Sequence, residues 1–261
     1  MSNAAVNIAA IAMRNFQTNI NSLANDVSNA LTVGYKKHYV ETVDNFYTTL
    51  QRAGETKPVN IQMGSGSKIN GIYRILQQGA PKQTNNPLDL MINGAGYFAV
   101  LYNEKPAYTR NGSFKLDNQR RIVTSDGYLL DGEFEVPEGV DTNTIKVNEY
   151  GVISATGPEN NNIDIGRVNL YTFSNERALM SIGNNLLVPP DDEGIAVGEI
   201  VENLPGEGGV GKILQHHLED SNVDTIESIQ KLMELQQGFQ LATNIMKSAS
   251  ELEKELNKVN G

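Results

Sequence analysis

A glycine-rich run in the last quarter of the chain is the stretch that comes nearest to a phosphate-binding loop. Residues 206–213 read GEGGVGKI, and Gly206-x-x-x-x-Gly211-Lys212 has the spacing of that motif. In such loops the residue after the lysine is a Ser or Thr that holds magnesium, and a helix N-terminus binds the phosphates. Here that residue is Ile213, and too few residues follow before a polar junction to form the helix. The run therefore predicts a turn between strands rather than a nucleotide site.

The other reactive residue types do not form a catalytic or metal-binding pattern. His216 and His217 are adjacent, so on a strand they face opposite sides, and no cluster of Asp, Glu or His joins them. Asp131, Glu133 and Glu135 alternate along a strand-like segment and are typical of a solvated face. The chain has no cysteine and no Gly-x-Ser-x-Gly elbow. We therefore expect no catalytic residue, no metal ligand, no cofactor and no enzyme activity.

Composition narrows the class of protein further. The 261 residues are 39% hydrophobic and 20% charged, which is ordinary for a folded protein, and no run of about 18 apolar residues could span a membrane. The net charge of −10, without a basic stripe, argues against a nucleic-acid partner. The first residues lack the basic region of a signal peptide, so we interpret them as part of the mature structure.

The first predicted element is a helix over residues 4–31. Its apolar residues recur at spacings of three or four, which places them on one face. That predicted seam contains Ile8, Ala12, Phe16, Ile20, Leu23 and Val27. The opposite face is made of Asn, Gln, Ser and Ala, with Arg14 and Asp26 as its charges. A face of small uncharged residues suits a helix that touches neighbours on several sides, and we expect intermolecular packing.

The last predicted element is a helix over about residues 225–259. Asp224 can cap it, and Glu227 follows in the capping-box position. The predicted seam contains Leu232, Leu235, Phe239, Ala242, Met246, Ala249, Leu252 and Leu256. A helix of this length spans roughly 50 Å, more than one small β domain needs for its cover. Its simplest partners are the N-terminal helix and other copies of the chain.

The middle of the chain, residues 59–218, has the pattern of β structure. Short apolar runs are bounded by Gly, Asn, Asp and Pro, and Asn111-Gly112 and Asp126-Gly127 are hairpin-turn signals. The predicted fold is α+β: long terminal helices pair as a coiled-coil-like hairpin, and an antiparallel, barrel- or sandwich-like all-β domain is inserted between them. The predicted segments are the helix of 1–33, a connecting and hairpin region of 34–72, the β domain of 73–219 and the helix of 220–261.

Three groups of residues resemble signatures of the rod and hook family of bacterial flagellar axial proteins. ANDVSNALTVGYKK (24–37) resembles the N-terminal signature, from which Asp26 and Ser28 depart. QTNNPLDLMINGAGYFAV (83–100) and AYTRNGSFKLDNQRRIVTSDGYLL (107–130) resemble the central β segments, and LEDSNVDTIESIQKLMELQQGFQ (218–240) resembles the C-terminal signature. The residues that fit are Asn25, Asn29, Thr32, Gly34, Tyr35, Lys36, Thr109, Arg110, Gly112, Ser221, Asn222 and Val223.

The resemblance implies a structural subunit of the flagellar rod, most similar to the distal-rod members. Such proteins leave the cytoplasm unfolded through the type III export apparatus, without a cleaved signal, and polymerise helically under a rod cap in the periplasm. The implied product is a hollow drive shaft around the export channel that carries motor torque to the hook. The implied partners are copies of the same chain, other rod proteins, the hook protein and the P- and L-ring proteins, with no nucleic acid and no small-molecule substrate.

Three alternatives remain open at this point. The chain could be a proximal-rod subunit, because the segment 51–60 is shorter than an extended stretch of typical distal-rod chains. It could be a monomeric β-domain binding module with helical arms, which would not polymerise. The third alternative is a nucleotide-dependent enzyme that uses the loop at Gly206. For a rod subunit, we expect both terminal helices to be disordered in the isolated monomer while the β domain is folded.

Overall fold

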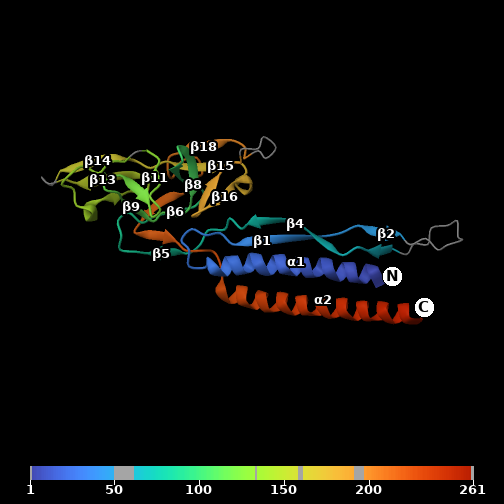
Figure 1. Cartoon of the computed structure of the whole chain (residues 1–261). Coiled ribbons are helices and arrows are strands. Elements are labelled where there is room, and N and C mark those ends of the chain that lie inside the picture. The colour runs from blue at the N-terminus through green and yellow to red at the C-terminus, as the bar shows by residue number, and fades with distance from the viewer. Residues whose placement is uncertain (1, 50–61, 133, 158–160, 191–196, 260–261) are drawn as a thin grey trace. The chain divides into compact units, whose positions relative to one another are not determined.

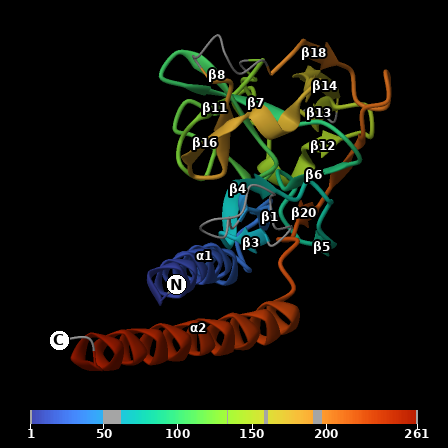
Figure 2. The same ribbon diagram turned by 90° about the vertical axis from the view of Figure 1, so that its right-hand side faces the viewer.

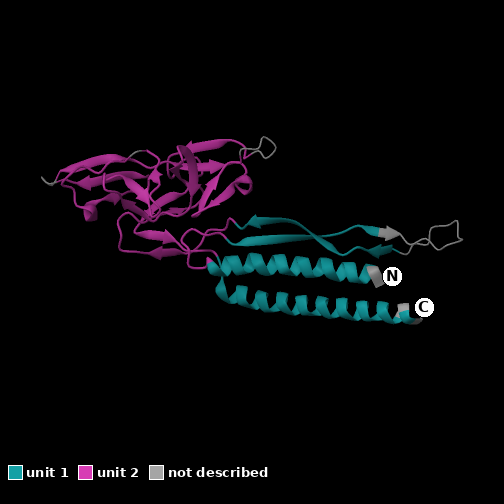
Figure 3. Ribbon diagram, viewed as in Figure 1, with its two compact units in different colours: residues 1–28, 37–75, 223–261 teal, residues 29–36, 76–222 magenta. Residues whose placement is uncertain are grey.

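The chain divides into two units, each of which is described by itself. The computed structural model describes residues 2–49, 62–132, 134–157, 161–190 and 197–259. Unit 1 consists of residues 1–28, 37–75 and 223–261, and unit 2 consists of residues 29–36 and 76–222 (Figure 3). The division does not follow chain order, because the short segment 29–36 belongs to unit 2 although unit 1 surrounds it in sequence.

Unit 1 is built around its two long helices, α1 (Ser2–Ser28) and α2 (Thr225–Val259). They pack against each other and run in opposite directions, so both chain ends lie at the same end of the pair (Figure 1). The contact is close where small residues face the partner helix. A Cβ on Gly238 would lie 2.6 Å from the Phe16 ring, and Ala242 and Ala249 are buried.

Unit 1 also contains a long β-hairpin. β1 (His38–Asp44) pairs antiparallel with β4 (Ser67–Arg74), with a bulge between Glu41 and Thr42, and β2 (Tyr47–Thr49) pairs with β3 (Gln62–Gly64). The strands lie along α1 (Figures 1 and 2). The Asn15 side chain of α1 donates hydrogen bonds to the carbonyl (2.9 Å) and hydroxyl (3.0 Å) oxygens of Ser67. An uncharged polar residue of the helix therefore binds β4 without burying a charge.

Unit 2 consists of short strands that are joined by turns. Its largest sheet has seven strands in the order β16-β17-β8-β7-β11-β10-β9, and β12-β13-β14 form a second sheet. Three further pairs are β15–β18, β19–β6 and β20–β5. The bounds are β5 (Pro81–Gln83), β6 (Leu90–Asn93), β7 (Phe98–Tyr102), β8 (Lys105–Thr109), β9 (Phe114–Leu116), β10 (Ile122–Thr124), β11 (Leu129–Leu130), η1 (Thr142–Thr144), β12 (Lys146–Val147), β13 (Val152–Thr156), β14 (Asn162–Arg167), β15 (Leu170–Phe173), η2 (Glu176–Ala178), β16 (Met180–Gly183), β17 (Leu186–Val188), β18 (Ile200–Asn203), β19 (Lys212–Gln215) and β20 (His217–Glu219).

The core of unit 2 is one large apolar cluster with a smaller aromatic one beside β15. In the large cluster the Phe98 and Phe114 rings meet edge to face at 5.3 Å. In the small cluster Tyr108 packs on Phe173 at 4.7 Å. Gly112 is required next to the core, because a Cβ there would lie 1.7 Å from the Leu90 carbonyl oxygen.

The predicted barrel- or sandwich-like form of the β insertion is wrong. Among the described residues the seven-stranded sheet is open, because β16 pairs only with β17 at one end and β9 only with β10 at the other. A barrel requires its hydrogen-bonded ladder to continue all the way around. The strands of this sheet are two to five residues long and the remaining strands form separate small sheets, so no ladder closes. The α+β class itself fits two terminal helices and a β-rich middle.

The helix bounds are close to those expected from periodicity. α2 occupies the predicted range, and the Asp224 carboxylate accepts the backbone N–H groups of Ile226 (2.9 Å) and Glu227 (3.0 Å), which confirms the predicted cap. α1 ends at Ser28, three residues before the predicted end, and Leu31 is 95% exposed instead of continuing the stripe. Neither helix has an apolar stretch of the length that a membrane crossing requires, as far as the described residues go.

Candidate functional site

Most of the signature residues gather in one place within unit 2, which we call the motif junction. It comprises the segment 29–36, Arg110 with its neighbours, and residues 219–222. Gly34 adopts φ +72°, and a Cβ there would lie 2.9 Å from the backbone of Arg110 and Asn111. Its N–H donates to the Glu219 carbonyl at 2.7 Å. The glycine is needed both for its positive φ and for the close approach of two chain segments.

The segment 29–36 is shaped by its own polar residues and held by its neighbours in unit 2. The Thr32 N–H donates to the Asn29 carbonyl at 3.0 Å, and the two side-chain oxygens of these residues lie 3.1 Å apart. The Tyr35 N–H donates to the Thr32 carbonyl at 3.2 Å, and the Tyr35 carbonyl accepts the Asn222 N–H at 3.4 Å. The first and last signatures are therefore joined directly through backbone groups.

A buried ionic triad lies at the centre of the motif junction. Lys36 Nζ forms an ion pair with Glu219 Oε1, and Arg110 Nη1 lies 3.6 Å from Glu219 Oε2. The side chains of Lys36, Arg110 and Glu219 are 9%, 8% and 1% exposed. Burial lowers the pKa of the Lys36 ammonium, and the Glu219 carboxylate opposes that shift. Three charged groups are thus withdrawn from water, and the Glu219 carboxylate lies between two cations whose combined charge exceeds its own.

Backbone groups supply further hydrogen bonds to the triad, although Arg110 Nε and Glu219 Oε2 are buried without a hydrogen-bond partner. Lys36 Nζ donates to the Gln77 carbonyl at 2.9 Å, and the Gly79 N–H donates to Glu219 Oε1 at 3.0 Å. Arg110 Nη1 donates to the Gly94 carbonyl at 2.8 Å, and its guanidinium lies 4.9 Å from the centre of the Tyr97 ring. The carboxylate and the two cations are thus held in fixed positions by backbone groups of unit 2.

The remaining signature residues take supporting positions. The Thr109 hydroxyl accepts the Asn111 N–H at 3.0 Å, and Gly112 lies against Leu90. The Asn222 side chain donates to the Gln77 carbonyl at 2.9 Å, and Ser221 is half-buried beside it in sequence. Asn25 on α1 and Val223 before α2 belong to unit 1 instead. The motif junction therefore unites ten of the twelve predicted signature residues with Glu219.

Glu219 and Asp26 form buried contacts that the sequence did not predict. The signal for Glu219 was its place in the C-terminal signature beside Ser221. Asp26, a departure from the N-terminal signature, is buried in unit 1 and accepts the His38 N–H at 3.0 Å, with His38 Nδ1 at 2.9 Å. The departure from the signature thus has a partner in β1.

The predicted seam residues of α1 and α2 are mostly half-buried, and few of their side chains are fully buried. Ala242 and Ala249 are buried, whereas Leu252 is 58% exposed and the side chain of Leu256 lies outside the described part of the structure. The half-buried members are Ile8, Ala12, Phe16, Ile20, Leu23, Val27, Leu232, Leu235, Phe239 and Met246. The assignment of these residues to contacts between subunits stays a prediction.

A second apolar stripe runs along α2, away from the buried seam. It is formed by exposed side chains and we call it the outer stripe. Its members are Ile226, Ile229, Met233, Leu241, Ile245 and Leu252. Of these, Ile245 is 57% and Leu241 63% exposed. Leu252, which the sequence predicted for the seam, belongs to the outer stripe by its exposure, and the two stripes together surround much of the helix. An exposed apolar stripe of this length marks an interaction surface.

The residues that resembled reactive motifs are engaged in structural contacts. In the glycine run, Gly206 N–H donates to the Gly211 carbonyl at 3.0 Å, and a strand, β19, follows instead of a helix. Lys212 Nζ lies 2.6 Å from Glu149 Oε2. His217 Nδ1 contacts the Gln215 carbonyl, Asp131 accepts the Tyr171 hydroxyl, and Glu133 lies outside the described residues. No group of three potential metal ligands occurs in the described part of the chain.

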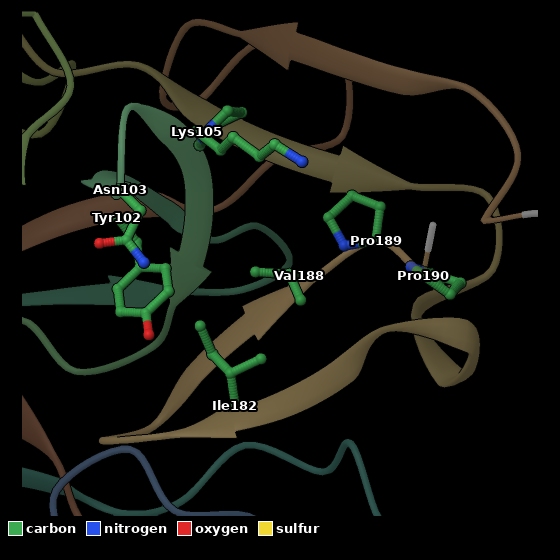
Figure 4. A pocket seen from close by; sticks show the side chains of 8 residues that line it. Tyr102, Asn103, Lys105, Ile182, Val188, Pro189 and Pro190 are labelled. Atoms are coloured by element: carbon green, nitrogen blue, oxygen red, sulfur yellow. The ribbon is translucent and has the colours of Figure 1, made fainter. Parts of the chain in front are cut away.

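One apolar pocket of about 450 Å³ opens on unit 2 (Figure 4). The β7–β8 turn contributes Tyr102 and Lys105, β16 contributes Ile182, and Val188 and Pro189 come from β17 and the segment after it. Figure 4 shows Tyr102, Ile182 and Val188 around it. The lining offers apolar surface and no nucleophile paired with a base, so it does not constitute a catalytic site.

Two family models match the chain. The D1 domain of the flagellar hook proteins FlgE/F/G matches residues 91–155, and the C-terminal model of the flagellar basal-body rod proteins FlgEFG matches residues 214–259. The first match covers much of the seven-stranded sheet, and the second covers α2 with the end of unit 2. Both models describe axial proteins of the flagellum.

Relatives of known name match the chain almost from end to end. The flagellar basal-body rod protein FlgG of Caulobacter vibrioides is 34% identical over 95% of this chain and 96% of the relative. FlgG of Bacillus subtilis is 34% identical over 94% of each, and FlgF of Caulobacter vibrioides is 27% identical over 91% of each. The chain belongs to the flagellar basal-body rod protein family. It is a structural rod subunit of the flagellar basal body that assembles with other flagellar components.

Proposed function

We propose that the chain is a distal-rod subunit that polymerises helically through unit 1 into the hollow drive shaft of the flagellum. The observation that carries the proposal is the outer stripe of α2, which stays exposed after α1 has covered the opposite face of the helix. Packed side by side, copies of unit 1 would bury this stripe. A contact between two different faces of the same subunit propagates from copy to copy, and it forms an open helix where the rotation does not close into a ring.

The half-buried seam of α1 supports the same proposal. Phe16, Leu23 and Val27 keep part of their surface in contact with water in a single chain. Apart from Arg14, the exposed positions of α1 carry uncharged residues such as Asn7 and Gln17, which can be buried between copies without leaving unpaired charges. Unit 1 therefore has two incompletely covered faces that other copies can use.

The family membership supports the remaining parts of the proposal. A distal rod transmits torque to the hook, turns inside the P- and L-rings and surrounds the export channel, so the hook, ring, cap and export proteins are the proposed partners. The proposed route is export from the cytoplasm without a cleaved signal peptide, and the proposed location is the periplasmic span of the rod. A role without catalysis accords with the contacts of Lys212, His217 and Asp131.

A proximal-rod role is the second candidate function. The 27% identity to FlgF of Caulobacter vibrioides over 91% of both chains favours it, although the FlgG relatives of the same and other organisms reach 34%. The segment 51–60, whose length raised this alternative, lies outside the described residues. Complementation separates the two roles: expression in a flagellated host that lacks its FlgG should restore rod completion, whereas rescue of an FlgF deletion alone would favour the proximal role.

Substitution in the outer stripe tests the polymerisation itself. We expect Ile245→Asp to abolish polymers, because a charge would have to be buried between copies, while the subunit stays folded because Ile245 is exposed. Sedimentation of purified protein at rising concentration measures the polymer, and circular dichroism checks the fold. The control is Gln236→Asp, which adds the same charge at an exposed polar position of the same helix. Normal polymers from Ile245→Asp would refute the outer stripe as the contact.

A further inference from the structure

The net charge of the chain lies entirely on unit 2. Unit 2 contains 11 Lys and Arg residues and 21 Asp and Glu residues, which gives −10. Unit 1 contains 10 residues of each sign and is neutral. The unit with the uncovered apolar faces therefore carries no net charge, and the other unit carries all of it.

The exposed charged side chains of unit 2 are predominantly acidic. Among the described residues, ten acidic side chains are exposed: Glu104, Asp126, Glu135, Glu138, Asp141, Glu149, Asp164, Glu199, Glu202 and Glu207. The basic side chains that are exposed in the described part of unit 2 are Lys82, Lys105, Lys115, Lys146, Arg177 and Lys212. Lys36 and Arg110 are buried in the triad, so two of the positive charges are withdrawn from the surface. The surface excess is therefore negative.

We propose that ionic strength controls self-assembly of this chain, because copies attract one another through unit 1 and repel one another through unit 2. The inference rests on the proposed polymerisation and adds its electrostatic regulation. Every added copy brings another acidic unit 2 into the polymer, and the accumulated charge opposes growth. The apolar contacts of the outer stripe must exceed this repulsion before a polymer can form.

The direction of the salt effect distinguishes a polymer that is limited by repulsion between copies of unit 2 from a polymer that is held together by ion pairs. Screening lengths fall from about 30 Å at 0.01 M salt to about 8 Å at 0.15 M, so added salt removes repulsion between exposed charges on adjacent copies. A polymer held together by ion pairs would instead weaken as salt is added. Unit 1 has no net charge, so copies of unit 1 do not repel one another through a net charge of their own.

The critical concentration for polymerisation measures the effect. We expect it to fall roughly tenfold between 0.02 M and 0.3 M sodium chloride, because the screening length becomes shorter and the repulsion between copies of unit 2 weakens. Sodium chloride is used rather than sulfate, because sulfate also strengthens apolar contacts. An unchanged or rising critical concentration would overturn the inference.

Two matched variants separate charge repulsion from general salting-out. The first variant changes Glu138, Glu199 and Glu207 to Gln, which reduces the negative charge of unit 2 by three. The second variant changes Lys82, Lys115 and Lys146 to Gln, which increases that negative charge by three. All six side chains are exposed, so folding is preserved. We expect the acidic-to-neutral variant to polymerise at lower salt and the basic-to-neutral variant to need higher salt. Identical salt curves for the three proteins would overturn the inference.

The same experiment distinguishes failure of this inference from failure of the proposed function. If no variant polymerises at any salt or protein concentration, the proposed self-assembly is wrong. If polymers form and their critical concentration does not change with salt or with the charge of unit 2, the proposed self-assembly is supported and the proposed electrostatic control is wrong.

Discussion

At the scale of single residues, the charges of the motif junction determine which substitutions are costly. Glu219 is almost fully buried and its carboxylate is balanced by Lys36 and Arg110. Lys212 and Glu149 form a pair of similar chemistry at the surface, where water solvates both partners. The same residue types thus have different roles because their exposure differs.

Lys36→Ala is predicted to destabilise unit 2 by about 3–5 kcal/mol, because the Glu219 carboxylate would be left with one cation in a buried position. Urea unfolding followed by tyrosine fluorescence measures the change. Lys212→Ala is the control: its side chain is half-exposed, and we expect little change in the unfolding midpoint. Equal effects of the two substitutions would show that the triad does not stabilise the motif junction.

At the scale of elements, β8 and β15 bring together a buried tyrosine, Tyr108, and a half-buried one, Tyr171. Tyr108 and Tyr171 lie 5.5 Å apart, and the Tyr171 hydroxyl donates to Asp131 Oδ2 at 2.6 Å. Burial raises the pKa of Tyr171, and the Asp131 carboxylate raises it further. Burial raises the pKa of Tyr108 as well. Both phenols are therefore held in the neutral form by the folded sheet.

Alkaline pH is predicted to weaken unit 2 through these tyrosines. Their folded-state pKa values lie above the unfolded value of about 10, so the unfolded chain releases the protons first. The stabilisation is complete below about pH 10 and is lost as the pH rises through the folded-state values. Tyrosinate absorbance and urea midpoints between pH 8 and 12 measure it. Asp131→Asn should let Tyr171 ionise at lower pH, and an unchanged titration would contradict the role of Asp131.

The elements also show where periodicity is informative. The spacing of Phe16, Leu23 and Phe239 predicts two long helices, and α2 has the predicted bounds. Periodicity did not predict that α1 ends at Ser28, because Leu31 continues the apolar spacing. The helix ends there because the segment 29–36 is bent by the turn at Asn29 and Thr32. Local hydrogen bonds of this kind compete with the helix, and apolar spacing does not report them.

At the scale of the whole molecule, the division into units predicts where proteases cut. If the terminal helices are disordered before assembly, limited proteolysis of the monomer should remove residues 2–28 and 225–259. The segment 29–36 should survive with residues 76–222, because Lys36 and Gly34 are bound within unit 2. Mass spectrometry of the resistant fragments identifies the boundary. Protection of both helices in the monomer would contradict the expected disorder.

The sequence by itself determined the terminal helices, the β-rich middle, the family resemblance and the signature residues. These properties follow from local spacing, turn chemistry and residue identity, which neighbouring residues suffice to express. Only the tertiary structure decided that the seven-stranded sheet is open and that residues 29–36 join unit 2. It also revealed that Lys36, Arg110 and Glu219 form one buried triad and that α2 keeps a second apolar face exposed. Such facts depend on contacts between residues far apart in the chain, and no local pattern specifies which of them meet.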